Sequence, residues 1–169
     1  MKLSKRAGAI IEWIIAAVLL VICIKVVLPY ASISPLKVLE KVEKADHYGP
    51  SEIVKSIDDG NERLYLGRYK DWCSATTVKR KLFLWHEVST KGGYLIDYSK
   101  DVSYYWTIDD GFLVCGYVNN PEIITLEIGE ESYCVDEHRM FIFRQEIQDS
   151  YTLRGFNKDG RIIYEENIQ

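Results

Sequence analysis

The residue types that could carry out acid–base or nucleophilic chemistry are few in this 169-residue chain. Histidine is the natural general base near neutral pH, and a serine beside it can act as a nucleophile. No Gly-x-Ser-x-Gly turn or other local signature brings such a pair together, so we predict no catalytic residues and rank a hydrolase last among the functions. The candidates considered are His47, His86, His138, Ser74, Ser89 and Ser132.

Three of the four cysteines, Cys73, Cys115 and Cys134, lie beyond the N-terminal apolar segment. An oxidising compartment permits one disulfide among them and leaves one thiol over. We predict the pair Cys115–Cys134, since both lie in strands expected to be neighbours; the alternative, three reduced and buried thiols, stays open. No pair has the short Cys-x-x-Cys or His-x-x-x-His spacing of a zinc site, so we expect no metal and no cofactor.

Aromatic residues are concentrated in two short segments, "KDWCS" and "DVSYYWTIDD". If exposed, such rings can stack on sugars or anchor a partner protein. Alternate members of the set would instead fill the core if the strands are buried. The candidate binding aromatics are Trp72, Tyr104, Tyr105 and Trp106.

A basic run, Lys79 to Lys81, interrupts the strand-like segment "VKRKLFLWHEV". Lysines on an edge strand block aggregation, and an edge strand can also recruit a strand from a partner. An edge strand is therefore one interpretation of this segment, which its exposure would decide.

Acidic residues precede glycine in "IDDG" at 57–60 and 108–111 and in "NKDG" at 157–160. The alternating ligands and closing glutamate of a calcium loop are missing. Asp-Gly between strands is the usual composition of a tight hairpin turn, which is the interpretation we adopt.

The segment 7–28 is apolar over 22 residues, and "EWIIAAVLLVICIK" lies within it. A helix of that length spans the ~30 Å hydrocarbon core of a bilayer. Glu12 and Lys25 are close enough to its ends to reach the headgroups, and Trp13 and Tyr30 fit the two interfacial aromatic belts. We predict a transmembrane helix at 7–30.

Other N-terminal signals fit less well. A cleaved signal has a shorter apolar region of about 7–15 residues, although cleavage after the segment stays open. The lipobox-like segment 20–23 has Ile22 where that motif requires a small residue. A prepilin leader would require glycine in place of Ala7. The segment is also similar to the first span of type I signal peptidases, but the segment 32–35 lacks the methionine of their Ser-x-Met-x-Pro motif.

The basic tail sets the expected orientation. Lys2, Lys5 and Arg6 precede the span without any acidic residue, so the positive-inside rule places 1–6 in the cytoplasm and the rest of the chain outside the cell. The part beyond the span carries 17 Lys and Arg against 24 Asp and Glu. That acidic balance argues against nucleic acid as a partner.

A short juxtamembrane helix is expected within 31–50. Ser34 is a suitable N-cap, Pro35 suits the first helical position, and apolar residues recur at helical spacing until 46–50. We expect one face of this helix to pack on the outer domain.

The remainder, 51–169, is predicted to be a β-rich sandwich or curved-sheet domain, so the chain is mainly β. Two subdomains meeting near 100–112 are an open possibility. The strand-like runs are 52–57, 63–69, 73–88 as a hairpin or bent strand, 94–98, 102–108, 112–118, 123–128, 132–135, 140–144, 152–156 and 161–164.

The segments "GYVNNPEIITLEIG", "RMFIFR" and "YTLRGFNKDGRIIYE" resemble the C-terminal β unit of a group of uncharacterised, membrane-anchored or lipidated extracytoplasmic proteins of Gram-positive bacteria. Its Gly-x-Val-x-Asn-Pro-x-Ile pattern begins one strand, and a Lys-Asp-Gly turn closes the last hairpin. "SPLKVLEKVEK" and "VKRKLFLWHEV" are similar to that group's helix and aromatic strand. The resemblance implies a location and a fold, and no activity.

Together these features predict a single-pass protein of the cell membrane with an extracytoplasmic binding or interaction domain. The first hypothesis is a subunit or regulator of an envelope complex. The second is a domain that binds cell-wall glycan or peptide. The expected partners are the lipid bilayer through 7–30 and either an envelope protein or a wall polymer.

Overall fold

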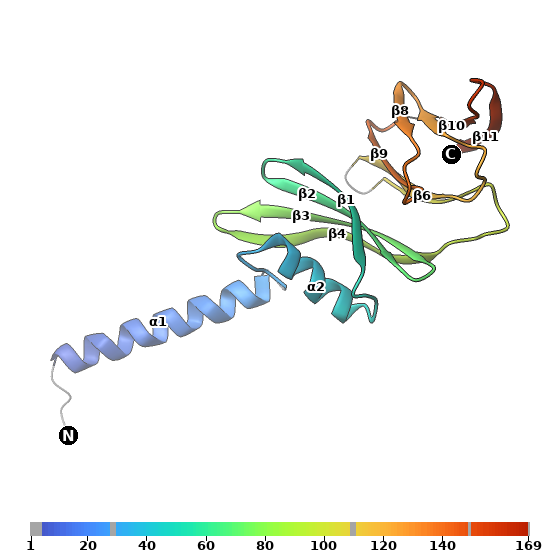
Figure 1. The fold of residues 1–169 in the computed structure, drawn as a ribbon. Helices are drawn as coiled ribbons and strands as arrows, with labels where there is room; N and C mark the ends of the chain where they lie inside the picture. Colours follow the sequence, from blue (N-terminus) through green and yellow to red (C-terminus); the bar gives the residue numbers. More distant parts are fainter. Residues whose placement is uncertain (1–4, 28–29, 109–110, 149, 169) are drawn as a thin grey trace.

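The computed structural model describes residues 5–27, 30–108, 111–148 and 150–168 and confirms the mainly β class. Within them, two helices precede a run of antiparallel strands (Figure 1). The helices are α1 (Lys5–Val27) and α2 (Pro35–Ala45), and the strands are β1 (Glu52–Asp59), β2 (Glu62–Tyr69), β3 (Trp72–Lys81), β4 (Leu84–Leu95), β5 (Val102–Thr107), β6 (Phe112–Val118), β7 (Thr125–Ile128), β8 (Glu131–Cys134), β9 (Met140–Gln145), β10 (Tyr151–Phe156) and β11 (Ile162–Ile168).

Helix α1 projects away from the β domain (Figure 1). Its segment Ala7–Val26 has a mean hydropathy of 2.7 and is nowhere buried against the rest of the chain. The helix is therefore long and apolar enough to span a membrane. It ends at Val27, and Tyr30 adopts a left-handed φ of 66°; residues 28–29 of the predicted span lie outside the described residues.

Helix α2 confirms the predicted juxtamembrane helix. Ser34 is its N-cap with extended backbone angles, although its side chain makes no capping hydrogen bond. The face carrying Val38, Leu39 and Val42 is buried against the first sheet, where it contacts Tyr65, Val78 and Trp85. Apolar residues at positions i, i+1 and i+4 of a short helix form such a stripe.

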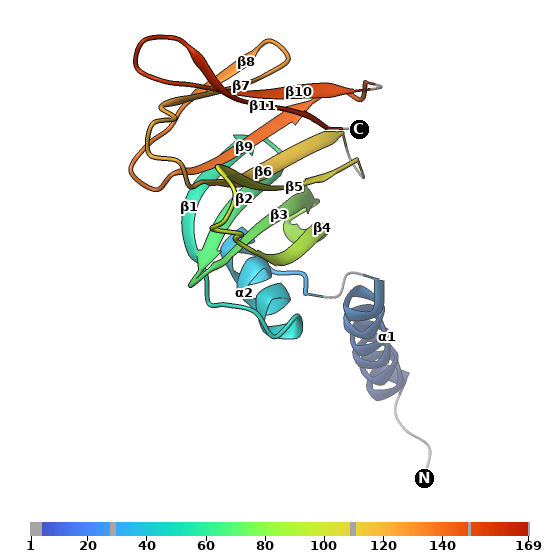
Figure 2. The same cartoon turned by 90° about the vertical axis from the view of Figure 1, so that its right-hand side faces the viewer.

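The strands form three sheets. Their orders are β1-β2-β3-β4, β5-β6-β9 and β11-β10-β7-β8, and we call them the proximal, central and distal sheets. Figure 2 shows them stacked in that order, with α2 against the outer face of the proximal sheet. The domain is thus a β sandwich of three layers with one helix on its outside.

The central sheet separates two cores because successive residues of a strand point to opposite faces. In β9, Met140 and Ile142 enter the core shared with the proximal sheet, whereas Phe141 and Phe143 enter the core shared with the distal sheet. The proximal core holds Leu64, Leu66, Cys73, Ala75, Ile96, Cys115, Met140 and Ile142. The distal core holds Val102, Phe112, Val114, Val118, Ile123, Leu126, Ile128, Phe141, Phe143, Tyr151, Leu153 and Ile168.

Polar contacts also join the layers. Arg144 in the central sheet lies 2.6 Å from the carboxylate of Glu62 in the proximal sheet, Nη1 to Oε1. The Lys55 ammonium of β1 lies 4.3 Å from the ring centroid of Tyr133 in β8. The proximal sheet is therefore fixed to both other sheets, although it is built from an earlier part of the chain. The subdomain boundary near 100–112 stays a prediction.

Two predicted strand features need correction. Strand β3 pairs with β2 on one side and β4 on the other, so the interpretation that Lys79–Lys81 belong to an edge strand is wrong. The separate strand predicted at 94–98 is wrong too, because its first residues are the end of β4.

The Asp-Gly turns are confirmed at two sites. Gly60 and Gly160 adopt φ of 59° and 73° between paired antiparallel strands. The turn at 108–111 lies partly outside the described residues.

Candidate binding groove beside strand β5

Strand β5 is an end strand of the central sheet and places three of the four predicted aromatics side by side. Tyr104 is half-buried against the distal core. Tyr105 and Trp106 are each 36% exposed. The ring of Tyr105 stacks on Tyr94 of β4, with centroids 6.0 Å apart, and Trp106 lies 5.9 Å from Phe112. Because successive residues of a strand point to opposite faces, the two exposed rings pack against different neighbours.

A groove of about 570 Å³ runs along β5, between this strand and the end of β4. Its lining includes four aromatic residues together with an acidic residue, a basic residue and a serine. Such a mixture of apolar area and a few polar groups is typical of ligand sites. The lining residues are Tyr94, Leu95, Asp97, Lys100, Ser103, Tyr104, Tyr105 and Trp106.

The polar side of the groove is a tight turn held in place by hydrogen bonds. Asp97 Oδ1 accepts from the backbone N–H of Ser99 at 3.0 Å and from its hydroxyl at 2.6 Å, and these bonds hold the pKa of the carboxyl below its usual range. The amide of Asn119 donates to the carbonyl oxygens of Asp97 and Lys100 at 2.9 and 2.7 Å. The carboxylate therefore stays ionised in an ordered turn.

The hydroxyls of Tyr94 and Tyr104, two of the three tyrosines at the groove, are engaged with the protein. Tyr94 donates to the carbonyl oxygen of Cys115 at 3.1 Å, and burial raises the pKa of this phenol far above its usual value. Burial, followed by a hydrogen bond to Glu166, raises the pKa of Tyr104 to about 12. Both phenols keep their protons at neutral pH, so the groove offers ring faces and not phenolate chemistry.

Trp72, the fourth predicted aromatic, lies elsewhere. It is 41% exposed and lines a different groove of about 370 Å³ together with Asp46, His47, Tyr48, Tyr69 and Gly93. The structure therefore brings together Tyr104, Tyr105 and Trp106 but separates Trp72 from them.

The histidines lie apart from the serines considered above. His86 Nδ1 is 3.0 Å from the backbone oxygen of Glu87. His138 lies 3.8 Å from its neighbour Glu137 on the surface. His47 lies beyond the C-terminal end of α2. Among the residues that the structure describes, none of the three is hydrogen-bonded to a serine.

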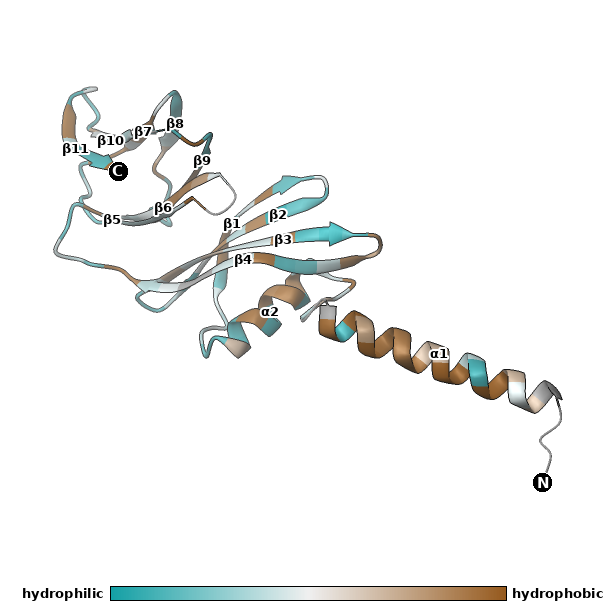
Figure 3. Ribbon diagram, turned by 180° about the vertical axis from the view of Figure 1, so that it is seen from behind, coloured by the Kyte–Doolittle hydropathy of each residue, from teal (hydrophilic) through white to brown (hydrophobic). Residues whose placement is uncertain are grey.

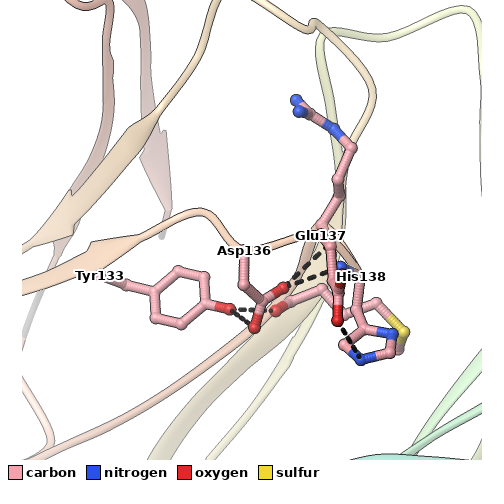
Figure 4. A network of polar contacts seen from close by, with 6 residues as sticks. Tyr133, Asp136, Glu137 and His138 are labelled. Carbon is pink, nitrogen blue, oxygen red and sulfur yellow. Dashed lines mark hydrogen bonds and ion pairs between the residues drawn. The ribbon is translucent and has the colours of Figure 1, made fainter.

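The contacts around His138 belong to the turn between β8 and β9 (Figure 4). The hydroxyl of Tyr133 lies 2.8 Å from Asp136 Oδ2 and 2.9 Å from the carbonyl oxygen of Met140, two acceptors that share its single proton. Asp136 Oδ1 accepts from the backbone N–H groups of His138 and Arg139 at 3.0 and 3.1 Å. Tyr133 and Asp136 thus close the turn, which is a structural role, and the His138–Glu137 pair lies on the surface.

The predicted disulfide is not formed in the structure. Cys115 and Cys134 are both free thiols in different sheets, because β6 pairs with β5 and β9 whereas β8 pairs with β7. Cys134 is exposed, while Cys115 is buried in the proximal core with Cys73. In the described part of the chain, no group of three His, Cys, Asp or Glu residues is placed to hold a metal ion.

Some residues of the groove escaped the sequence analysis. Tyr94 and Leu95 reach it from a strand pairing that the sequence does not reveal. The role of Asn119, which supports the turn beside the groove, was not predicted either. No family model, curated protein or solved structure matches this chain.

Proposed function

We propose that this chain is a single-pass membrane protein whose β domain lies outside the cell and binds a segment of another envelope protein in the β5 groove. The observation that carries the proposal is the pair of exposed rings, Tyr105 and Trp106, on an end strand of the central sheet. The role is that of a subunit or regulator of an envelope complex. No nucleic acid is expected as a partner.

An extended peptide fits this groove for two physical reasons. An end strand can pair with an added strand, which supplies main-chain hydrogen bonds. Partly exposed aromatic rings that are already packed lose little conformational freedom on binding, and such residues are common anchors of interfaces. Tyr105 is held by Tyr94, and Trp106 by Phe112. The groove is thus largely formed before a partner arrives.

The polar side of the groove supports a second candidate, a cell-wall glycan or peptide. Sugars bind to aromatic faces flanked by hydrogen-bonding groups, and Asp97, Lys100 and Ser103 line the same groove. Retention of the full-length protein on purified wall material, lost on substitution of Trp106, would favour this candidate over a protein partner.

Crosslinking on intact cells with a C-terminally tagged copy tests the protein partner. We expect one protein to copurify in stoichiometric amount with the parent chain and with Trp72→Ala. We expect Tyr105→Ala and Trp106→Ala to lose it. Trp72 is a matched control because its exposure, 41%, is close to the 36% of the two groove residues. Equal loss from all three variants, or retention by all three, would contradict the assignment to the β5 groove.

Labelling of Cys134 tests the location of the domain. This thiol is exposed, whereas Cys73 and Cys115 are buried. A maleimide that cannot cross membranes should therefore label the parent protein on intact cells. It should not label the Cys134→Ser variant under the same conditions. Because Cys23 is also exposed, labelling that appears only after lysis would show a cytoplasmic domain where the parent chain gains label that Cys134→Ser does not. The intact mass of the protein reports separately whether α1 is retained.

A further inference from the structure

The turn between β3 and β4 carries two large apolar side chains in solvent. Leu82 is 85% exposed and Phe83 is 63% exposed. Leu82 exceeds every other large hydrophobic residue of the described chain in exposure, including those of α1. A soluble hairpin tip gains nothing from such residues, and adjacent exposed apolar side chains mark interaction sites.

The backbone of this turn makes the choice of leucine more unusual. Leu82 adopts a φ of 59°, and the neighbouring hairpin between β1 and β2 has glycine, Gly60, at the same φ of 59°. A left-handed conformation disfavours a bulky side chain and suits glycine. The β3–β4 turn thus keeps an exposed leucine where glycine would relieve strain, which points to a role for the side chain.

The tip lies beside the C-terminal part of α1. A groove of about 470 Å³ is lined by Leu20, Cys23 and Ile24 of the helix and by residues 81–84 of the hairpin. Figure 3 shows the apolar β3–β4 tip extending alongside α1, whereas the more distant β1–β2 tip is hydrophilic. Leu20 is six residues before Val26, the end of the apolar window. Ile24, the nearest of the three, is two residues before it, so at the rise of an α-helix the tip lies about 3–9 Å below that end.

Positive charges surround the base of the tip. Arg80 and Lys81 are exposed and form no ion pair with the residues that the structure describes, while Lys79 lies 3.5 Å from Glu62. Lys25 and Lys41 line a second groove next to Leu84. Long basic side chains can extend from an apolar site to headgroups. Apolar residues within about 5–10 Å of the headgroup boundary and basic residues above them are typical of interfacial membrane contacts.

We infer that the β3–β4 tip inserts into the outer leaflet of the bilayer crossed by α1, with Leu82 and Phe83 among the lipid chains and Arg80 and Lys81 at anionic phospholipid headgroups. This inference rests on the proposed membrane anchor. The domain then has two attachment points on the bilayer, which limit its tilt and set the height of the β5 groove above the membrane.

Site-directed spin labelling of the full-length chain in vesicles tests the insertion. The background carries Cys23→Ser and Cys134→Ser; Cys73 and Cys115 are 0% and 1% exposed and do not take the label. Single labels are placed by Leu82→Cys and Phe83→Cys at the tip. Asn61→Cys on the neighbouring hairpin and Lys158→Cys on the β10–β11 turn are the aqueous controls, and Ile15→Cys in α1 is the lipid control.

The readout is the ratio of collisions with oxygen to collisions with a water-soluble nickel complex, in vesicles of phosphatidylcholine and phosphatidylglycerol. We expect labels at 82 and 83 to give ratios below that at 15, which lies deeper in the bilayer, and several-fold above those at 61 and 158. Arg80→Glu combined with Lys81→Glu should lower the ratio at 83 in these vesicles more than in pure phosphatidylcholine.

Each contrary result has a distinct meaning. A water-exposed tip together with a lipid-exposed label at 15 overturns the insertion and leaves the anchor intact. Water exposure at both 15 and the tip removes the anchor itself. A tip shielded from both oxygen and nickel indicates contact with protein and also overturns the lipid assignment.

Discussion

The two cores on either side of the central sheet are filled by different kinds of side chain. The distal core contains only hydrocarbon and aromatic residues, with Phe112 stacked on Tyr151 at 4.2 Å between centroids. The proximal core contains two thiols and a methionine, all less than 2% exposed. The β5 groove and the β3–β4 tip both involve the proximal sheet. The β5 groove borders both cores, since Tyr105 stacks on Tyr94 beside the proximal core whereas Tyr104 and Trp106 pack on the distal core.

The largest expected effect is on the distal core. Phe141 and Met140 are adjacent on β9, both 0% exposed, and point into different cores. We expect Phe141→Ala to lower the free energy of unfolding by about 3–5 kcal/mol. Met140→Ala should lower it by about 2–3 kcal/mol, because a flexible thioether is surrounded by residues that can readjust. Denaturant unfolding of the full chain in detergent micelles measures both.

A matched pair of conservative variants refines the same contrast. Replacement by leucine nearly preserves the volume of methionine, so Met140→Leu should change the free energy of unfolding by less than about 1.5 kcal/mol. Phe141→Leu removes ring contacts with Phe143, whose centroid lies 5.8 Å away, and should lower it more. Equal changes in the free energy of unfolding for Met140→Leu and Phe141→Leu would show that the two cores respond alike, which would contradict the contrast drawn between them.

Alkaline pH should destabilise the proximal core first. Burial raises the pKa of Cys73 to about 11 and raises that of Cys115 also, from a usual value near 9. The unfolded chain therefore releases these protons at lower pH than the folded chain. The stabilisation is complete below about pH 9 and is lost as pH rises toward 11, at about 1.4 kcal/mol per pH unit for each thiol.

Unfolding between pH 8 and 10 in the presence of a reductant measures this slope. Tyrosines with raised pKa, Tyr94 among them, contribute only as pH approaches their own usual value of 10. Cys73→Ala combined with Cys115→Ala should flatten the curve of unfolding free energy against pH, whatever the effect of the two substitutions on packing. If the slope of unfolding free energy against pH is unchanged in that variant, titratable groups other than the two thiols cause the loss of stability at alkaline pH.

A smaller effect is expected for the ion pair that joins the proximal and central sheets. The Glu62 side chain is 11% exposed and lies 2.6 Å from Arg144, whose side chain is 38% exposed. Solvent around the arginine reduces the loss below that of a fully buried pair, so we expect Glu62→Gln to lower the free energy of unfolding by about 1–2 kcal/mol. The exposed pair Arg154–Glu165 is the control. Glu165→Gln should change the free energy of unfolding by less than about 1 kcal/mol.

The sequence predicted local elements better than the contacts between them. Strand β6 begins at Phe112 and ends at Val118, as the period of two predicted. The alternation of inward and outward residues depends only on the sequence of the strand itself. Which strands pair depends on distant segments. A Cys115–Cys134 disulfide was predicted because their strands were expected to be neighbours, but the structure places β6 against β9 and β8 against β7.

The candidate groove shows the same limit. Tyr104, Tyr105 and Trp106 gather there because they are consecutive on one strand. Tyr94 and Leu95 reach the groove through the packing of the proximal sheet on the central sheet, for which no local pattern exists. The β3–β4 turn was ambiguous for a different reason, since "KLFLWH" contains none of the glycine, proline or asparagine that usually marks a turn.

The smallest expected effect has the opposite sign and concerns the strained tip of the proximal sheet. Leu82→Gly should raise the free energy of unfolding by about 1 kcal/mol, because glycine adopts a φ of 59° without the steric penalty of leucine. Gly60→Leu is the mirror control: it places leucine at the same φ on the neighbouring tip, and we expect a loss of about 1 kcal/mol. Both are measured by thermal unfolding in detergent. If Leu82→Gly also lowers the lipid exposure of a label at 83, the strain at 82 is explained by membrane contact; a variant that gains stability and keeps that exposure would show that Phe83 alone holds the tip in the bilayer.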